Sequence, residues 1–292
     1  MSRHLRDRLP EWLVTLPPMG WLAVLFLLPT VLIFAISLRP ADPFGGIGAG
    51  WTLDHVRALA APHYVIIAAR TVLFSLLTTA ICLFLALPTG YYIARAPGRW
   101  RQTLLLLVVV PFWTSFLIRI FAWKVLLHPD GLFKQALACL RLVSADAALL
   151  YHPPAVLLVM VYTCLPFAIL PVYAAAEKFD FQLLEAARDL GAGRFQAFLR
   201  VFVPGIRRGV LTAVLVVLIP ALGTYVIPDL VGGPTSEMIG NKIAQRVFVD
   251  RNLPHAGALA ALLTLGVLLP MAAVLVLQAR GRRRAPTDEE GL

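Results

Sequence analysis

The sequence contains few charged residues. They make up 14% of the 292 residues, against about 25% in a typical soluble domain, while 59% are hydrophobic and the mean hydropathy is +0.79. A chain with so little charge cannot cover its surface with polar side chains in water. The composition therefore excludes an ordinary soluble globular protein and indicates an integral membrane protein.

Motifs for nucleotide, metal or hydrolytic chemistry are also missing. The three cysteines, Cys82, Cys139 and Cys164, form no C-x-x-C pair, and the six histidines lie scattered over the predicted tails and outer loops. The sequence has no G-x-x-x-x-G-K-[ST] phosphate loop, no G-x-S-x-G and no H-E-x-x-H. We therefore expect no enzyme active site, no metal site and no cofactor in this chain. If ATP drives its function, partner subunits must bind the ATP and Mg.

Six apolar runs are long enough to cross a bilayer, which takes roughly 20 residues of helix. A backbone in hydrocarbon must satisfy its own hydrogen bonds, so these runs predict an all-α membrane protein rather than a barrel of short alternating strands. The predicted spans are Met19–Leu38, Val65–Ala94, Thr103–Trp123, Pro154–Ala176, Gly209–Val231 and Ala256–Ala279. Arginine is concentrated in 1–18, in the short connection 95–102 between the second and third predicted spans, in 177–208 and in 280–292. By the positive-inside rule, these segments are predicted to be cytoplasmic, with both termini inside and 19–279 as one membrane domain.

The cytoplasmic segment 177–208 is polar and has its own pattern. Asp180 is a suitable N-cap for a short helix, and Gly191 stands where a left-handed residue would end it. A second helix is predicted to carry one apolar stripe and to close at Pro204. The stripe consists of Phe195, Phe198, Leu199 and Phe202.

The same segment resembles the EAA loop of ABC-importer permeases. It reads Glu185-Ala186-Ala187, three residues, Gly191, nine residues, then Val201-Phe202-Val203-Pro204. The resemblance implies a type I importer (MetI-like) permease fold in the bacterial inner membrane, in which a coupling helix docks on a cytoplasmic ATPase. The residues that it assigns to this coupling are Glu185, Ala186, Ala187, Asp189, Leu190, Gly191, Ala192 and Pro204.

Further stretches are similar to permeases of spermidine/putrescine importers. They are Pro111–Ser115 with Arg119, Leu165-Pro166-Phe167 with Pro171, Gly223–Pro228 with Gly232-Gly233, and Leu253–Ala258. This likeness implies a polyamine as solute, a second permease in a heterodimer, two ATPase subunits and a periplasmic binding protein. Permeases for opines, phosphonates, iron or sulfate share much of the pattern and stay as alternatives. A secondary transporter without an ATPase is a further alternative, but the predicted spans carry almost no acidic residue at mid-depth.

Several residues near span ends are candidates for the translocation pathway. They are Trp113, Arg119, Tyr162, Pro166, Tyr225 and Asp229. Arg119 and Asp229 either line the pathway or reach the nearby interface, and the aromatic residues either wall the pathway or form an interfacial belt. Prolines inside the spans either kink the helices for packing alone or help a pathway to open and shut. Pro166 with Pro171, and Pro220 with Pro228, flank the coupling segment, where broken helices would suit such a pathway.

Overall fold

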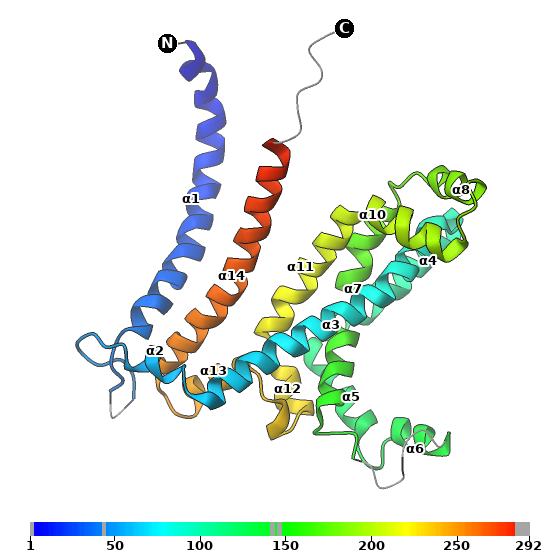
Figure 1. Cartoon of the computed structure of the whole chain (residues 1–292). Helices are drawn as coiled ribbons and strands as arrows, with labels where there is room; N and C mark the ends of the chain where they lie inside the picture. The colour runs from blue at the N-terminus through cyan, green and yellow to red at the C-terminus, as the bar shows by residue number, and fades with distance from the viewer. Residues whose placement is uncertain (1–2, 43–44, 141–143, 145–147, 284–292) are drawn as a thin grey trace. The chain divides into compact units, whose positions relative to one another are not determined.

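The computed structural model describes residues 3–42, 45–140, 144 and 148–283. Within these residues the secondary structure is helical apart from one isolated bridge between Ala41 and Ile47 (Figure 1). The chain divides into two compact units. One consists of the residues up to Val65 together with those from Lys242 onward, and the other of Ile66–Asn241.

The first unit contains α1 (Arg3–Ser37), α2 (Asp54–Ala58), the larger part of α13 (Ile239–Phe248) and α14 (Leu253–Arg283). Helix α1 packs along α14. Gly257 is needed at this contact, because a Cβ there would lie 3.2 Å from the Ile33 carbonyl oxygen and 3.3 Å from the Ser37 nitrogen. Helix α1 begins at Arg3, so it includes positions 3–18 that the sequence assigned to a separate tail. Likewise α14 continues to Arg283, and the remainder of the tail predicted at 280–292 lies outside the described residues.

The second unit contains most of α3 (Pro62–Arg95) and the elements that follow it. These are α4 (Gly98–Val109), η1 (Val110–Trp113), α5 (Phe116–Leu127), α6 (Leu132–Cys139), α7 (Pro153–Ala176), α8 (Gln182–Asp189), α9 (Arg194–Ala197), η2 (Phe198–Phe202), α10 (Val203–Gly205), α11 (Arg207–Gly223), α12 (Val226–Val231) and η3 (Pro234–Ser236). Helix α7 packs against α11 and lies at the centre of two apolar cores, one toward α8–α10 and one toward α5 and α12.

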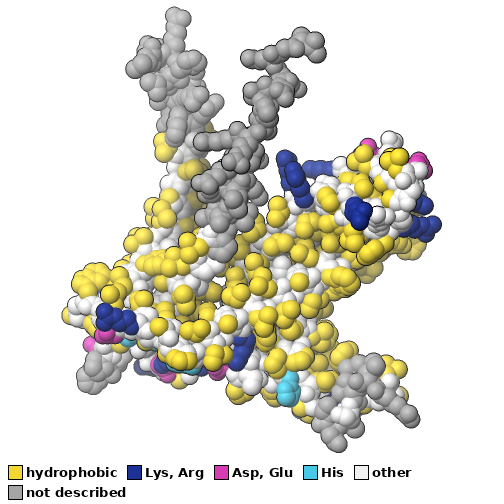
Figure 2. Space-filling model, in the orientation of Figure 1, with side chains coloured by type: hydrophobic (Ala, Val, Ile, Leu, Met, Phe, Trp, Pro, Cys, Tyr) yellow, Lys and Arg dark blue, Asp and Glu magenta, His cyan; other side chains and the backbone are white. Residues whose placement is uncertain are grey.

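Among the described residues, three helices are long and apolar enough to cross a membrane: Val14–Ser37, Pro62–Arg95 and Pro153–Ala176. The number rises to five if each of two bent helix pairs counts as one span. These pairs are Gly98–Trp113 with Phe116–Leu127, and Arg194–Gly205 with Arg207–Gly223. Large apolar side chains cover the outer faces of these helices, among them Phe84 at 76% and Ile118 at 64% exposure, and Figure 2 shows how widely such side chains cover the visible face. Lipid tails cover such surfaces at little cost, whereas water does not.

The span predicted over Thr103–Trp123 is a broken helix rather than a continuous one. Helix α4 with η1 and helix α5 meet at 90°. Pro111 lies in the tight turn of η1, and Thr114 takes an extended conformation with ψ 150. The Thr114 hydroxyl donates to the Pro111 carbonyl oxygen at 2.8 Å, which satisfies one of the acceptors that the break releases.

The helix predicted over Gly209–Val231 is also broken, between α11 and α12. A continuous helix would bring the Pro228 ring against the carbonyl of Thr224, four residues earlier. Thr224 is extended instead, with ψ 139. Helix α7 behaves differently, because it runs unbroken from Pro153 to Ala176 through both Pro166 and Pro171. Of the two alternatives for these prolines, a broken helix is therefore not found in α7.

The connections that the sequence predicts to be outer contain more helix than expected. Helix α2 lies in the first outer loop, and η3 and α13 lie in the last. A further short helix, α6, follows α5 and ends at Cys139; residues 141–143 lie outside the described residues.

Helices α7 and α11 approach closely at Gly209, which is buried. A Cβ at this position would meet the Ala175 Cβ and would lie 2.8 Å from the Pro171 carbonyl oxygen. Gly223, at the other end of α11, has no neighbouring atom within 4 Å of such a Cβ. A small residue is thus required at one end of the helix and not at the other.

We predict that Gly209→Ala lowers the free energy of unfolding by about 1–3 kcal/mol, the usual cost of overpacking a tight contact. The matched substitution Gly223→Ala should leave stability unchanged or raise it slightly, since alanine favours helix over glycine. Thermal unfolding of the two purified variants in detergent measures the difference. Equal melting temperatures would contradict the packing argument.

Candidate functional site

Helix α8 begins where the sequence placed the start of a coupling helix. The Asp180 carboxylate accepts a hydrogen bond from the Gln182 backbone N–H at 3.0 Å. The N-cap position itself is occupied by Phe181, one residue later than predicted. Asp180 nevertheless supplies an acceptor to the first turn, which is the physical role expected of it.

Gly191 ends this helix as the sequence predicted. Its φ of 90 is left-handed. Its N–H donates to the Arg188 carbonyl oxygen at 2.9 Å, and the Ala192 N–H donates to the Ala187 carbonyl oxygen at 3.0 Å. This pair of bonds is the Schellman arrangement, which strongly favours glycine at the left-handed position.

The second helix of the segment is less regular than predicted. It consists of α9, a π-helical turn over Phe198–Phe202 and α10, and a bend of 75° separates it from α11. The wider π turn changes the angular spacing of the side chains. As a result the predicted stripe divides: Phe202 is buried, whereas Phe195 is 74% and Leu199 46% exposed. The predicted apolar stripe is therefore buried at Phe202 and exposed at Phe195 and Leu199.

Pro204 does not close this unit, because the helix continues to Gly205 and the bend follows at Ile206. In an α-helix the Pro204 ring would clash with the carbonyl of Arg200. The π turn contains Arg200 and immediately precedes Val203, so the chain accommodates the proline by widening the turn before it.

Phe202 anchors this segment to helix α3. We call residues 177–208 the elbow. The Phe202 ring is 5.0 Å from Tyr91 of α3 between centroids, 5.3 Å from Phe179 and 5.2 Å from Phe198, and its side chain is fully buried. Arg101 of α4 adds an ion pair to Glu177 at 3.0 Å. The aromatic packing gives the elbow a fixed seat on α3, where an exposed ion pair alone contributes little.

Helix α8 presents three different faces. Leu184 is 6% exposed and packs into the core near the elbow, with Ala187 beside it. Leu183 and Leu190 are 52% and 89% exposed, and with Ala186 they share a second face by the 100° helical spacing. The third face carries Glu185 and is described below with its neighbours. An exposed apolar face on a short polar helix is typical of a docking surface.

The predicted coupling residues thus lie together on one elbow but are exposed to different degrees. Glu185, Ala186, Asp189, Leu190, Gly191 and Pro204 are exposed, and Ala187 and Ala192 are half-buried. In Figure 2 basic side chains gather around the end of the second unit that carries α8, where fewer acidic side chains are visible.

The predicted pathway residues in η1, α5 and α7 do not form one cluster. Trp113 is 75% exposed. The Arg119 guanidinium lies 4.5 Å from the centroid of the Phe112 ring, and its Nε and Nη1 have no hydrogen-bond partner among the described residues. Tyr162 packs on Trp123 at 5.3 Å, and Pro166 is half-buried within α7.

Tyr225 and Asp229 lie on either side of the beginning of α12. The Tyr225 carbonyl oxygen accepts from the Asn241 side-chain amide at 2.9 Å, and its side chain is 44% exposed. Asp229 is exposed. The break before α12 therefore presents an aromatic ring and a carboxylate outside the helical core.

The side chains of α3 that bind the segment following α12 were not identified from the sequence. The buried hydroxyl of Thr71 accepts from the Ile239 backbone N–H at 2.9 Å and donates to the Ile67 carbonyl oxygen at 2.8 Å. Arg70 donates to the Pro234 and Glu237 carbonyl oxygens, both at 3.5 Å. Adjacent Arg-Thr inside an apolar run was the available signal, because polar groups in a span need partners.

Comparison with known proteins identifies the family. The family described as binding-protein-dependent transport system inner membrane component matches residues 86–284. The spermidine/putrescine transport system permease protein PotB of Escherichia coli (strain K12) is 35% identical over 246 residues, covering 84% of this chain and 90% of that protein. PotC of the same strain, also a spermidine/putrescine permease protein, is 32% identical over 127 residues, covering 43% of this chain and 47% of that protein.

Solved structures support the fold. A bacterial ABC transporter involved in the import of the acidic polysaccharide alginate contains a chain with a TM-score of 0.73 and 18% identity, covering 98% of this chain and 100% of that one. The alginate transporter in complex with a pentasaccharide-bound periplasmic protein gives a TM-score of 0.69 at 19% identity, covering 98% and 99%. With the family match over most of its length, the chain belongs to the binding-protein-dependent transport system inner membrane components, the permease subunits of ABC importers.

Proposed function

We propose that this permease carries a polyamine such as spermidine or putrescine, and that the elbow couples it to cytoplasmic ATPase subunits. The choice of a polyamine as solute rests on the 35% identity to a spermidine/putrescine permease over 84% of the chain. A polyamine is a flexible polycation, so carboxylates and aromatic faces are the groups expected to attract it. Exposed Asp229 beside Tyr225, at the break between α11 and α12, offers both.

The geometry of the elbow supports the coupling role. Helix α8 presents Leu183, Ala186 and Leu190 outward, while Phe202 holds the same segment against α3. A force applied to the outer face of α8 would reach α3 and α7 through close packing, because packed cores transmit displacement rather than absorb it. Soft or extended connections would not do so.

The proposal includes the partners that such a permease needs. They are a second permease subunit in a heterodimer, two ATPase subunits that bind ATP and Mg, and a periplasmic solute-binding protein. PotC, related to part of this chain, is a second type of permease protein named for the same transport system as PotB. The alginate transporter was solved with a periplasmic protein bound. The sequence of this chain has no phosphate loop, so ATP must be hydrolysed elsewhere.

We further propose six spans with both termini in the cytoplasm, in the order α1, α3, α4 to α5, α7, α11 to α12, and α14. Arginines concentrate at alternate connections, which supports the elbow being on the inside. The broken helices α4 to α5 and α11 to α12 then each form one span, with the break covered by neighbouring protein. Opines, phosphonates, iron and sulfate remain the alternative solutes, and an ATP-independent transporter the more distant rival.

The native cysteines offer a test of this topology. Cys139 is exposed in α6, whereas Cys82 and Cys164 are buried. A membrane-impermeant maleimide added to spheroplasts should label Cys139, because α6 is proposed to lie outside. In a C139S background, a cysteine replacing exposed Gly193 should be labelled only in inverted vesicles. Labelling of that residue in intact spheroplasts would overturn the inward placement of the elbow.

Gly191→Asp should abolish coupling. At a φ of 90 a non-glycine residue is strained by about 1–3 kcal/mol, so the end of α8 must shift. We expect solute-stimulated ATP hydrolysis by the assembled complex to fall about tenfold or more, while membrane insertion is unchanged. Gly193→Asp is the matched control: it adds the same charge two residues away, at an extended position with no atom within 4 Å, and should retain stimulation. Full stimulation in the Gly191 variant would refute the role of the elbow.

Asp229→Asn should weaken polyamine transport. Loss of one exposed carboxylate on the solute path is expected to raise the KM for spermidine about threefold to tenfold, since rim charges act on capture of a charged ligand. Asp130→Asn, which removes another exposed outer carboxylate, should change it little. Uptake of labelled spermidine by cells that depend on this importer measures both. Uptake of no polyamine at all by the unmodified importer would favour one of the alternative solutes.

A further inference from the structure

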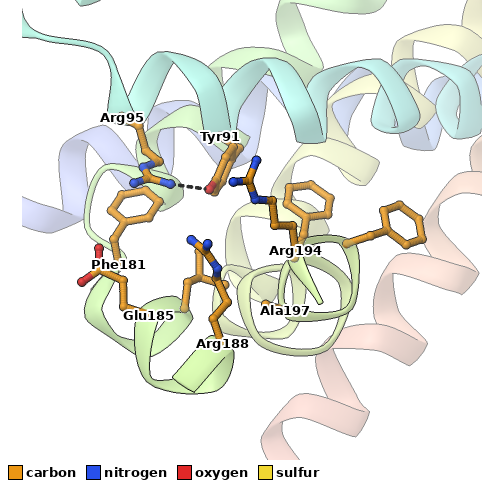
Figure 3. Close-up of a pocket in the computed structure, with 10 residues that line it drawn as sticks. Tyr91, Arg95, Phe181, Glu185, Arg188, Arg194 and Ala197 are labelled. Carbon is orange, nitrogen blue, oxygen red and sulfur yellow. Dashed lines mark hydrogen bonds between the residues drawn. The ribbon is translucent and has the colours of Figure 1, made fainter. Parts of the chain in front are cut away.

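The elbow encloses a hollow of ≈ 630 Å³ that coupling to an ATPase does not require. It lies between the end of α3, helix α8 and helix α9 (Figure 3). Arg95 comes from the last turn of α3, Arg188 from α8 and Arg194 from the first residue of α9. We call this cavity the arginine hollow.

The basic groups of the hollow face one another. In Figure 3 the guanidinium groups of Arg188 and Arg194 point toward the Tyr91 hydroxyl, beside that of Arg95. Arg95 donates to the Tyr91 hydroxyl at 2.7 Å and lies 5.6 Å from the centroid of the Phe181 ring. Three side chains from three helices therefore bring positive charge to one space.

The hollow lacks a compensating negative charge. Glu185 is its one acidic lining residue, and in Figure 3 its carboxylate points away from the three guanidinium groups. Within the described part of the chain, neither Arg188 nor Arg194 forms an ion pair. Like charges held together cost free energy, and a bound anion removes that cost. Phosphate suits the site best, since the guanidinium fork donates two parallel hydrogen bonds to phosphate oxygens.

The surroundings favour a lipid phosphate. The hollow lies at the end of an apolar helix long enough to cross a membrane. Tyr92 in the last turns of this helix and Trp100 in the first turn of α4 are 67% and 65% exposed. Exposed aromatic residues next to arginine at a span end are typical of the bilayer interface. Phe195 lines the hollow and is 74% exposed, so apolar surface suited to the glycerol and acyl part of a lipid lies beside the charges.

The position on α8 separates this site from the docking face. By the 100° helical spacing, Glu185 and Arg188 lie on the side of α8 opposite to Leu183, Ala186 and Leu190. An ATPase seated on the outward apolar face would leave the arginine hollow turned away from it. An acidic side chain of the ATPase is thus a poorer candidate for the hollow than a headgroup from the membrane.

We propose that the arginine hollow binds the phosphate of an anionic phospholipid of the inner leaflet and so holds the elbow at a fixed depth at the membrane surface. This rests on the proposed function only for the placement of the elbow on the cytoplasmic side. Anionic lipid would then favour the seated position of the segment that transmits movement to α3 and α7.

Lipid binding to the full-length permease, purified with its partner subunits, tests the site. Native mass spectrometry would count bound dioleoyl phosphatidylglycerol, with dioleoyl phosphatidylcholine and inorganic phosphate as the other probes. The R188Q/R194Q variant should bind phosphatidylglycerol at least about tenfold more weakly, since it loses two charge-assisted contacts to the phosphate. The control R200Q/R207Q removes two exposed arginines of the same elbow outside the hollow and should change binding less than about twofold.

Each other outcome overturns the proposal in a definite way. Equal losses in the two double variants would mean general attraction of lipid to a basic surface. Displacement of phosphatidylglycerol by inorganic phosphate at a similar concentration would make free phosphate the ligand. Unchanged lipid binding together with loss of the ATPase subunits from R188Q/R194Q would assign the hollow to an acidic partner residue. A common unfolding temperature for the two variants guards against a folding defect.

The test is independent of the coupling role. It measures lipid bound to the permease without ATP hydrolysis, whereas the Gly191→Asp experiment measures stimulated hydrolysis. Loss of coupling in the Gly191 variant with no lipid selectivity at the hollow would sink this inference alone. Selective lipid binding with normal coupling in the Gly191 variant would sink the proposed coupling instead.

Discussion

Phe202 lies fully buried among aromatic rings at the point where the elbow meets α3. It comes from a π-helical turn of the elbow. The rings around it belong to α3 and to other residues of the elbow, including those just before α8. Burying one such ring contributes roughly 1.5–3 kcal/mol, more than any exposed ion pair nearby. Without this contact α8 would keep only the packing of Leu184 and Ala187 besides its chain connections, which weakens the link that the proposed coupling needs.

The two faces of the elbow can serve different neighbours at the same time. The outward side of α8 is apolar and small, as a protein partner requires, while the opposite side gathers arginine against the end of an apolar helix. In the proposed arrangement the segment stands between the ATPase and the bilayer. Its fixed seat on α3 makes its position relative to the lipid headgroups a property on which transport can depend.

Two of the predicted spans in the second unit are interrupted by short stretches of irregular backbone. The breaks fall at Thr114 and Thr224, each close to a proline, and helix α7 between them in sequence is continuous. A straight central helix with bent neighbours allows movement on its flanks while its own contacts, such as that at Gly209, stay closed. Proline therefore has opposite consequences at Pro228 and Pro166, because neighbouring packing decides whether the lost hydrogen bond breaks the helix.

The sequence alone determined that the chain is a helical membrane permease, because its apolar runs and the spacing from Glu185 to Pro204 depend only on residue type and order. It also determined the end of α8, since a left-handed turn at Gly191 is a local requirement of the backbone. Local sequence patterns do not predict which side chains from other parts of the chain will make contact. The division of the aromatic stripe between Phe195 and Phe202, the hold of Thr71 on Ile239 and the meeting of Arg95 with Arg188 and Arg194 were decided only by tertiary structure. These contacts join residues far apart in the chain, and packing rather than periodicity selects which of them form.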